Sequence, residues 1–309
     1  MKILSVFLLT VIAIGCSQYR ANEAPPPRAE AKPNCQTAQL ADEVRQIAAV
    51  TKGPVGAGFE LLGTNETAFI EGQRHFPTQS VYKFPIAILV LREVDAGKLS
   101  LDQQIAVKPA DFVSDREFTI PRKYPQGADL SLRELLRYMI SESDGTACDV
   151  LLRLIGGPQK ATQALRELGV DNVNIGRFEK EMFETPSVAA ENWITPETAI
   201  ALLKLLQEGK VLSAPSHDLL IDLMIQSRPG AKRIKGLLPQ GTVVAHKTGT
   251  SATINGVTTA TNDIGLITLP DGRQLAIAVF VSDTKANETT REAVIAKIAA
   301  AGWKCWVRS

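Results

Sequence analysis

The stretch from Pro77 to Leu91 reads PTQSVYKFPIAILVL, and it places Ser80 and Lys83 three residues apart at the start of an apolar run. The pattern predicts a helix from Ser80, with Pro85 within its first turns, where a proline costs least. Side chains three residues apart share one face of a helix, so the Ser80 hydroxyl and the Lys83 amine would be neighbours. A serine is also a common helix cap and a helix lysine is usually solvated, so this pair alone does not establish any chemistry.

The elements predicted around this helix define the fold class as α/β (α+β). Alternating patterns predict two strands within residues 54–73 and three within residues 241–283, with helices before, between and after them. Short turns make such strands antiparallel, so we expect a five-stranded antiparallel sheet flanked by N- and C-terminal helices, with an inserted all-helical lobe. The sheet lobe would comprise about residues 35–78 and 227–309, and the helical lobe about 79–226. A site would lie in the cleft between the lobes.

Length and composition fit a globular enzyme with a sizeable core. The chain has 309 residues, of which 45% are hydrophobic and 22% charged, and its formal net charge is +1. This near-neutral balance provides no basic field, so we expect no nucleic-acid partner. The histidines, His75, His217 and His246, are scattered and no two cysteines form a C-x-x-C pair, so the sequence predicts neither a metal site nor a cofactor.

The first residues are typical of an export signal. Lys2 supplies one positive charge, and the apolar run from Ile3 to Ile14 is too short to span a bilayer. The run ends in AIGC, which resembles the lipobox of bacterial lipoproteins, so residues 1–16 are predicted to be a signal peptide with Cys16 as the lipidated residue. Ordinary cleavage, with a soluble secreted product, is the alternative.

A proline-rich segment, residues 17–34, follows the signal and is typical of an extended linker. It would separate the signal from a catalytic domain that spans residues 35–309. We therefore expect a periplasmic protein, tethered to a membrane through Cys16 if that residue is lipidated. We expect the folded part to be a monomer.

Export to an oxidising compartment makes the remaining cysteines informative. Cys35 opens the first predicted helix and Cys305 closes the last one, and terminal helices often pack together. A disulfide between them and two independent thiols are both compatible with the sequence. Cys148 lies inside an apolar helical pattern and is predicted to be a buried free thiol.

Two further motifs give the serine–lysine pair a chemical setting. The run SDG at residues 143–145 ends a predicted helix between the two lobes, and the run KTGT at residues 247–250 lies on a strand expected to border the cleft. The order S-x-x-K, S-D-x, K-T-G is the signature of serine β-lactamases and penicillin-binding proteins, in which a serine hydroxyl attacks once a base takes its proton. Lys83 could be that base if its pKa falls through burial or a neighbouring positive charge.

From Cys35 to its end the sequence resembles the class A serine β-lactamases, of the penicillin-recognising serine enzyme superfamily. Besides the motifs, the runs LSLRELLRYMISESDGTACDVLL and TNDIGLITLPDGR are similar to runs of that family. The resemblance implies the family's sheet-plus-helical-lobe fold and hydrolysis of the β-lactam amide bond of antibiotics. The family carries a deacylating glutamate on an omega loop, and the run R-F-E resembles its R-W-E, which points to Glu179. A solvated loop carboxylate, like Glu181 or Glu184, is the alternative for this residue, and the position of Arg177 favours the catalytic role.

The resemblance also implies a role for each catalytic residue. Ser80 attacks the lactam carbonyl, and Lys83, or Glu179 through a water, accepts its proton. Ser143 relays a proton to the departing ring nitrogen while Lys247 orients its hydroxyl. Glu179 then activates the water that hydrolyses the ester.

Substrate binding would depend on fixed donors and positive charge, because β-lactams carry a carboxylate. The residues implied in binding are Lys247, Thr248, Gly249, Thr250 and Arg233. The backbone N–H groups of Ser80 and Thr250 would form the oxyanion hole. Arg233 stands at one of the places from which family members supply an arginine, and a surface arginine is the alternative.

The sequence departs from the family pattern at three positions. Gly145 stands where an asparagine usually contacts the substrate amide, and Phe183 where an asparagine helps hold the deacylating water. Asn192 replaces an aspartate that usually pairs with the loop arginine, here Arg177, so we expect the loop to be held differently or to be more mobile. Phe118 is the candidate for the aromatic residue that stacks on substrate.

The leading hypothesis is an exported class A serine β-lactamase that acts on small-molecule β-lactams. The first alternative is a penicillin-binding D,D-peptidase or esterase of the same superfamily, which would lack the deacylating glutamate. The second is a silent β-lactam-binding sensor that keeps only the fold. The hydrolase is favoured because a silent protein would have no need to keep all five of the residues that the reaction requires. These are Ser80, Lys83, Ser143, Glu179 and Lys247.

Overall fold

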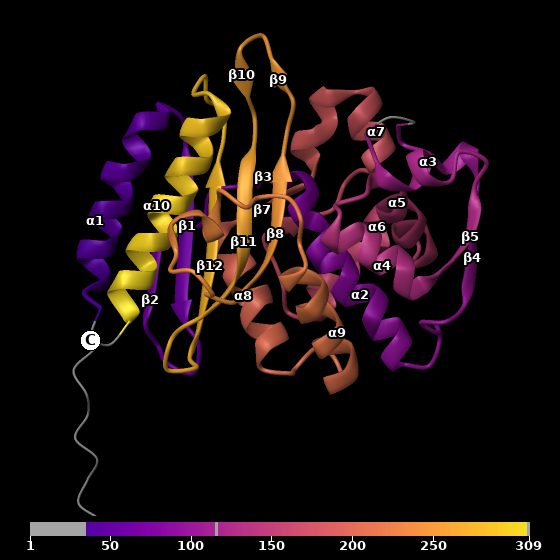
Figure 1. Ribbon diagram of the computed structural model, residues 1–309, viewed down its shortest axis with the longest axis horizontal. Helices are drawn as coiled ribbons and strands as arrows, with labels where there is room; N and C mark the ends of the chain where they lie inside the picture. Colours follow the sequence, from indigo (N-terminus) through magenta and orange to yellow (C-terminus); the bar gives the residue numbers. More distant parts are fainter. Residues whose placement is uncertain (1–34, 115–116, 308–309) are drawn as a thin grey trace, which may run out of the picture. The chain divides into compact units, whose positions relative to one another are not determined.

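The computed structural model describes residues 35–114 and 117–307. The predicted signal peptide, Cys16 and the linker lie outside these residues. Five strands form one antiparallel sheet in the spatial order β2-β1-β12-β11-β8 (Figure 1). They are β1 (Val55–Leu61), β2 (Thr67–Ile70), β8 (Val244–Thr250), β11 (Thr261–Thr268) and β12 (Gln274–Val281). The sheet predicted from the sequence is confirmed.

Both ends of the described chain build this sheet. β1 pairs with β12 along its whole length, from Val55 opposite Val281 to Leu61 opposite Leu275. The helices α1 (Thr37–Ala48) and α10 (Glu288–Trp306) pack on each other and cover one face of the sheet (Figure 1).

The central strands are apolar on both faces because both faces are covered. In β12, Leu275, Ile277 and Val279 belong to the core beneath α1 and α10. The alternate residues Ala276 and Ala278 belong to the core on the opposite face. The period-two alternation of a strand thus divides the apolar residues between two cores.

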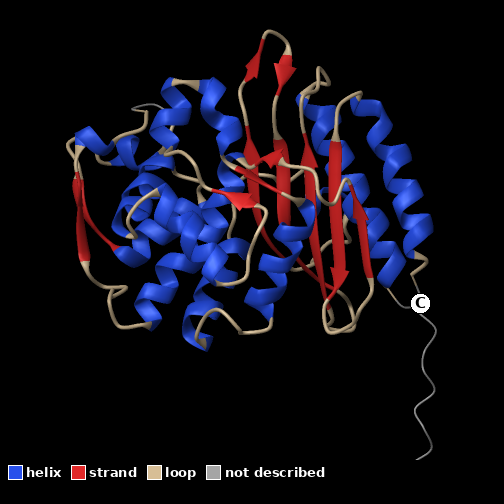
Figure 2. Cartoon of the chain, turned by 180° about the vertical axis from the view of Figure 1, so that it is seen from behind, coloured by secondary structure: helices blue, strands red, loops and turns tan. Residues whose placement is uncertain are grey.

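The opposite face meets the helices that lie between the second and the eighth strand of the chain, so the sheet lies between two groups of helices (Figure 2). The helix α2 (Lys83–Asp95) is at the centre of this group, and its residues from Lys83 to Leu91 are all buried. The helices around it are α3 (Thr119–Lys123), α4 (Leu132–Ser141), α5 (Gly145–Leu154), α6 (Pro158–Glu167), α7 (Glu179–Glu184), α8 (Pro196–Gln207) and α9 (Ala214–Ile225).

Several short elements had no clear signal in the sequence. Short strands pair in three small sheets: β3 (Phe76–Pro77), β7 (Trp193–Ile194) and β6 (Val173–Asn174); β4 (Gln104–Val107) and β5 (Ala128–Ser131); β9 (Thr253–Ile254) and β10 (Val257–Thr258). The 3-10 helices are η1 (Ala49–Thr51), η2 (Gln79–Tyr82), η3 (Pro109–Asp111), η4 (Pro186–Glu191) and η5 (Ile234–Leu237).

The helix predicted to begin at Ser80 begins differently. Ser80 lies in the 3-10 helix η2, and the α-helix α2 starts only at Lys83. Gln79, just before the serine, has a φ of 44°, in the left-handed region that residues other than glycine rarely adopt. Pro85 lies within the first turn of α2, as expected, where its missing N–H removes no helical hydrogen bond.

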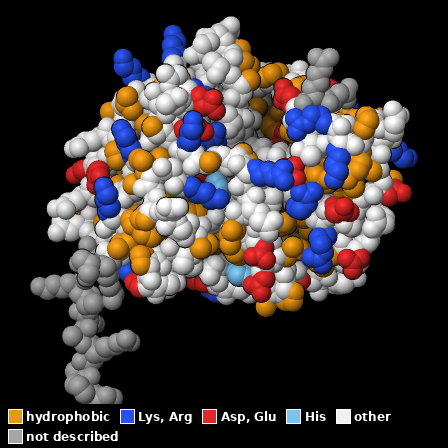
Figure 3. Space-filling model, in the orientation of Figure 1, with side chains coloured by type: hydrophobic (Ala, Val, Ile, Leu, Met, Phe, Trp, Pro, Cys, Tyr) orange, Lys and Arg blue, Asp and Glu red, His pale blue; other side chains and the backbone are white. Residues whose placement is uncertain are grey.

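The surface carries mixed charge. On the face shown in Figure 3, lysine and arginine side chains are interspersed with aspartate and glutamate, and this mixture agrees with the near-neutral net charge. Within the described ranges, no helix is both long enough and apolar enough to cross a membrane.

A disulfide joins the two ends of the folded part. Cys35, just before α1, is bonded to Cys305 in the last turn of α10, with 4.6 Å between their Cα atoms. Of the two arrangements compatible with the sequence, the bridge is therefore the one present. Cys148 is free and buried, as predicted.

Replacing both Cys35 and Cys305 with serine should lower the free energy of unfolding by about 2–5 kcal/mol, because the bridge closes a loop across most of the chain. Denaturant titration of the variant and the parent measures this difference. The parent treated with a reductant should unfold at the midpoint of the variant. Equal midpoints without reductant would mean that the bridge does not form.

Candidate active site

The Lys83 amine lies at the centre of the candidate site, with no exposed surface. Its Nζ atom is 2.8 Å from the Ser80 hydroxyl oxygen and 2.9 Å from the Ser143 carbonyl oxygen. The same atom is 2.8 Å from Glu179 Oε1. The S-x-x-K spacing thus brings the serine and the lysine together as predicted, and two distant segments meet them there.

The pKa of Lys83 differs from the one its role as a base would require. Burial is the largest single effect and lowers this pKa, but the Glu179 carboxylate, with smaller effects of Cys148 and Asp144, raises it by more in sum, so the pKa lies above the usual value. Lys83 could act as a base in the resting enzyme only if its pKa were lowered, and this condition is therefore not fulfilled. Lys83 is an ammonium group that donates to the Ser80 oxygen.

Ser143 and Lys247 form the second contact of the site. Ser143 lies in the break between α4 and α5 with a φ of 59°, so one helix ends just before the S-D-G run and the next begins at its glycine. Lys247, on β8, donates from Nζ to the Ser143 hydroxyl oxygen at 2.8 Å. Burial, and then the Lys83 charge, hold the pKa of Lys247 well below its usual value.

Glu179 is the first residue of α7, and Asp149 holds that helix end. Asp149 accepts hydrogen bonds from the backbone N–H of Glu179 at 2.7 Å and of Lys180 at 3.0 Å. Burial and the Glu179 charge raise the pKa of Asp149 to about 7. Asp149 was not identified from the sequence, although a polar residue within the apolar pattern of α5 was a usable signal.

Glu179 is also the loop glutamate in contact with Lys83. Glu181 instead pairs with Arg177 and accepts from the backbone N–H of Phe178 at 2.8 Å. Glu184 is exposed at the end of α7. Among these three carboxylates, the geometry therefore favours Glu179 for chemistry at Ser80.

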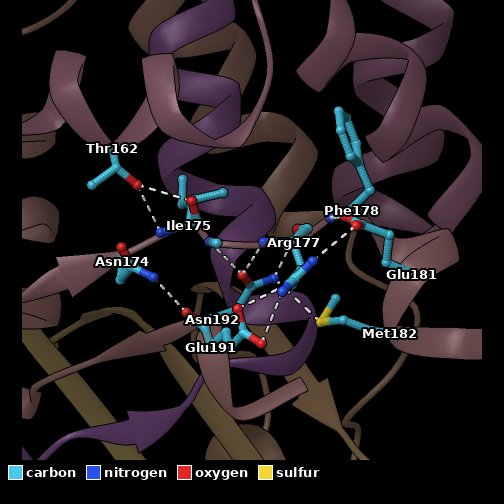
Figure 4. A network of polar contacts seen from close by, with 10 residues as sticks. Thr162, Asn174, Ile175, Arg177, Phe178, Glu181, Met182, Glu191 and Asn192 are labelled. Carbon is cyan, nitrogen blue, oxygen red and sulfur yellow. Dashed lines mark hydrogen bonds and ion pairs between the residues drawn. The ribbon is translucent and has the colours of Figure 1, made fainter. Parts of the chain in front are cut away.

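Asn192 holds the omega loop through backbone contacts (Figure 4). Its Oδ1 accepts from the backbone N–H of Gly176 at 2.7 Å and of Arg177 at 2.8 Å, and its Nδ2 donates to the Arg177 carbonyl at 3.1 Å. The Arg177 guanidinium pairs with Glu191 at 2.9 Å and with Glu181 at 3.2 Å. Of the two outcomes expected for this loop, it is held differently: an amide replaces the carboxylate, and the arginine has other partners.

The strand β8 lies against the turn that carries Ser80. A Cβ on Gly249 would collide with the Thr78 carbonyl oxygen and lie 3.2 Å from the Ser80 nitrogen, so a glycine is required here. Asn262 Nδ2 donates to the carbonyl oxygens of Pro77 and Thr78 at 2.8 and 3.1 Å. These contacts bring the Ser80 backbone N–H close to the K-T-G strand.

Arg233 is buried, so the alternative of a surface arginine is wrong. Its Nη2 donates to the Thr250 hydroxyl oxygen at 2.8 Å, and its Nη1 donates to the Gly249 and Asn262 carbonyls at 3.2 and 3.0 Å. Glu292 pairs with its Nε at 3.2 Å. Its contacts with the predicted site are therefore made to the Thr250 hydroxyl and to the Gly249 carbonyl, and Thr250 is the one contacted through its side chain.

Phe118 occupies the space that a larger residue at position 145 would need. A Cβ on Gly145 would lie 2.7 Å from the Phe118 ring. Asp144 holds this arrangement, because one of its carboxylate oxygens accepts from Ala147 N at 2.9 Å and the other from Ile120 N at 2.8 Å. The Phe118 ring centroid is 5.8 Å from the Lys83 amine, so the ring forms part of the wall of the site. Phe183, by contrast, is 44% exposed on α7.

Comparison with known proteins gives consistent matches over nearly the whole described chain. The sequence model of the family described as "Beta-lactamase enzyme family" matches residues 39–306. "Beta-lactamase VEB-1" from Pseudomonas aeruginosa is 36% identical over 279 residues, which cover 89% of this chain and 92% of that protein. "Extended-spectrum beta-lactamase PER-1" from the same organism is 39% identical over 268 residues, 86% of this chain and 87% of that protein.

A solved structure agrees with these sequence matches. The crystal structure of a β-lactamase from Chitinophaga pinensis superposes with a TM-score of 0.85 at 46% identity, and the match covers 86% of this chain and 98% of that one.

Replacing Gly145 with Asn should lower the free energy of unfolding by about 1–3 kcal/mol, because the new Cβ overpacks the Phe118 ring. The cost should shrink in a Phe118→Ala background, where that ring is absent. Thermal unfolding of the four proteins of this double-mutant cycle measures the coupling. Equal costs in both backgrounds would contradict the steric assignment.

Replacing Asp149 with Asn should flatten the dependence of stability on pH. The pKa of Asp149 is raised from 3.8 to about 7, so the folded protein binds this proton more tightly than the unfolded chain. The resulting stabilisation is complete below pH 3.8 and is lost as the pH rises through about 7. Melting temperatures from pH 4.5 to 8 should therefore change less in the variant. Asp129→Asn, at an exposed site on β5, is the control, and a pH profile for Asp149→Asn that coincides with the parent's would refute the assignment.

Proposed function

The chain belongs to the class A β-lactamase family, and from that premise we propose that Ser80 carries out its hydrolysis of β-lactams. The family and the fold predicted from the sequence are confirmed, and so is the reaction: the protein is a hydrolase that acts on the cyclic amide of β-lactam antibiotics. The observation that carries the residue assignment is the Lys83 ammonium, which contacts both the Ser80 oxygen and Glu179.

Acylation begins with transfer of the Ser80 proton. Because Lys83 is already an ammonium, the Glu179 carboxylate takes this proton through a water, and the ammonium stabilises the developing alkoxide. The Ser80 oxygen then bonds to the lactam carbonyl carbon. The backbone N–H groups of Ser80 and Thr250 stabilise the negative charge on the carbonyl oxygen.

The ring opens when its carbon–nitrogen bond breaks and the nitrogen gains a proton. Ser143 supplies this proton from its hydroxyl, which Lys247 holds at 2.8 Å. The lowered pKa of Lys247 makes its ammonium a ready source for the replacement proton.

The substrate carboxylate lies against the K-T-G strand. Lys247 supplies positive charge, and the hydroxyl groups of Thr248 and Thr250 supply hydrogen bonds. Gly249 leaves room for the strand to approach the turn of the nucleophile. Arg233 acts through Thr250, whose hydroxyl it holds at 2.8 Å.

Before deacylation, Glu179 loses the proton it took from Ser80 to solvent and Lys247 regains one, so both return to their resting charge. Glu179, on the loop that Asn192 and Asp149 hold in place, then takes a proton from a water whose oxygen bonds to the ester carbonyl carbon. The bond from that carbon to the Ser80 oxygen breaks, and the proton on Glu179 returns to Ser80. The exposed Phe183 offers no polar group to this water, so Glu179 acts with one fixed partner fewer than in relatives with an asparagine there. A D,D-peptidase would not need a glutamate in contact with Lys83, so this contact favours the hydrolase over that alternative.

The proposal extends to where the enzyme acts. An export signal at residues 1–16 would deliver it to the periplasm, and a lipid on Cys16 would tether it through the linker of residues 17–34. We propose that the folded part acts as a monomer.

The substitution Glu179→Gln should slow deacylation by about 10²–10⁴-fold, because the amide cannot take a proton from water. Acylation should stay detectable, because without this carboxylate burial lowers the pKa of Lys83, whose amine can then take the Ser80 proton. Intact-mass spectra after mixing with penicillin should then show the covalent adduct, whereas the parent releases opened drug without accumulating one. Ser80→Ala should show neither adduct nor opened drug. Parental turnover by the Gln variant would refute the role of Glu179, and an adduct that persists on the parent would favour a penicillin-binding protein.

A further inference from the structure

A second polar cluster lies on the face of β8 opposite Lys247. Along this strand Val244 and Ala245 belong to different cores, so His246 points toward the α10 side and Lys247 toward the site. His246 meets Asp263 of β11, and neither side chain has any exposed surface. The His246 Nδ1 atom is 2.9 and 3.0 Å from the two Asp263 carboxylate oxygens.

A fully buried carboxylate needs donors close to it. Besides His246, Asp263 accepts from the backbone N–H of Ile234 at 3.2 Å. Ile234 is the first residue of η5 and directly follows Arg233. Asp263 therefore fixes the backbone next to the arginine that reaches the site.

Arg233 connects this cluster to the side of the strand where the substrate would bind. Its Nη2 holds the Thr250 hydroxyl at 2.8 Å, while Glu292 pairs with its Nε at 3.2 Å. A continuous series of contacts thus connects His246, through Asp263 and the start of η5, to a hydroxyl group proposed to bind the substrate carboxylate.

The His246 ring acts through one nitrogen. Among the residues that the structure describes, its buried Nε2 atom has no hydrogen-bond partner. A buried N–H without an acceptor is rarer in proteins than an unpaired acceptor, so the proton is placed on Nδ1, where Asp263 accepts it. The function of the ring therefore depends on a donor at the Nδ1 position.

We propose that His246 and Asp263 are positioning residues that hold Arg233, and through it the Thr250 hydroxyl, in place for the carboxylate of the β-lactam. The inference rests on the proposed function of Thr250. It predicts that loss of the Nδ1 donor weakens substrate binding and leaves the chemistry at Ser80 largely intact.

Two amide substitutions separate positioning from packing. Asparagine at position 246 places its N–H₂ donor near the former Nδ1, toward Asp263, but leaves a cavity. Glutamine fills more of the space, but its donor falls near the former Nε2, where the described chain offers no acceptor. If the ring only fills space, His246→Gln should change KM less than His246→Asn. If the ring positions Asp263, His246→Asn should change KM less than His246→Gln.

We expect His246→Gln to raise KM for penicillin about five-fold with kcat nearly unchanged, the size expected for one hydrogen bond. His246→Asn should keep KM within about two-fold of the parent even though its melting temperature falls. Adding Arg233→Ala to His246→Gln should raise KM no further than Arg233→Ala alone, because both act on Thr250. His217→Gln is the matched control, since His217 pairs with Asp218 at 2.9 Å on α9 and should leave KM unchanged.

A parental KM in His246→Gln, or effects of the Gln and Ala substitutions that multiply, would overturn the inference. Should the position-246 variants not fold, the resonance of the His246 Nδ1 proton can be followed while Glu179→Gln is acylated with penicillin. A shift supports the coupling, and no shift overturns it. A parent enzyme that never hydrolyses penicillin would instead refute the proposed function, so the two failures are distinguishable.

Discussion

The buried ammonium of Lys83 is the constraint on which the rest of the site depends. A full charge without exposed surface is stable only with close counter-charge and hydrogen-bond acceptors. Those acceptors come from η2, from the break between α4 and α5, and from α7. The Lys83 charge is therefore stabilised only where these three segments pack together. Ser143, whose carbonyl oxygen accepts from Lys83, has an uncommon backbone φ of 59°.

The two buried lysines of the site differ in charge environment rather than in depth. Both have no exposed surface, but Lys83 touches Glu179, whereas Lys247 touches only neutral oxygens and lies near the charge of Lys83. Burial lowers the pKa of each, and for Lys83 the neighbouring carboxylate together with Cys148 and Asp144 raises it by more. Two buried residues of one type therefore differ in the direction of their pKa shift, upward for Lys83 and downward for Lys247.

Much of this site could be predicted from the sequence because its parts are short and local. Helical and strand periodicity were sufficient for the five-stranded sheet, and K-T-G lies on the strand expected for it. Ser80, however, lies in η2, before the α-helix that it was expected to begin. Contacts that depend on loop conformation could not be predicted: Arg177 pairs with Glu191, and Phe118 lies over Gly145. His246 and Asp263 left a signal that was passed over, because polar residues within apolar strands are rarely buried without a purpose.

The position of β1 in the sheet has a consequence for how the protein matures. It lies between β2 and β12, so one of its two neighbours follows it in the sequence only after the whole helical lobe. One edge of β1 therefore stays unpaired until the segment that forms β12 is available. The pairing of β1 with β12 thus has to close a loop that contains the whole helical lobe, and we expect this closure to be a slow step in the folding of the sheet.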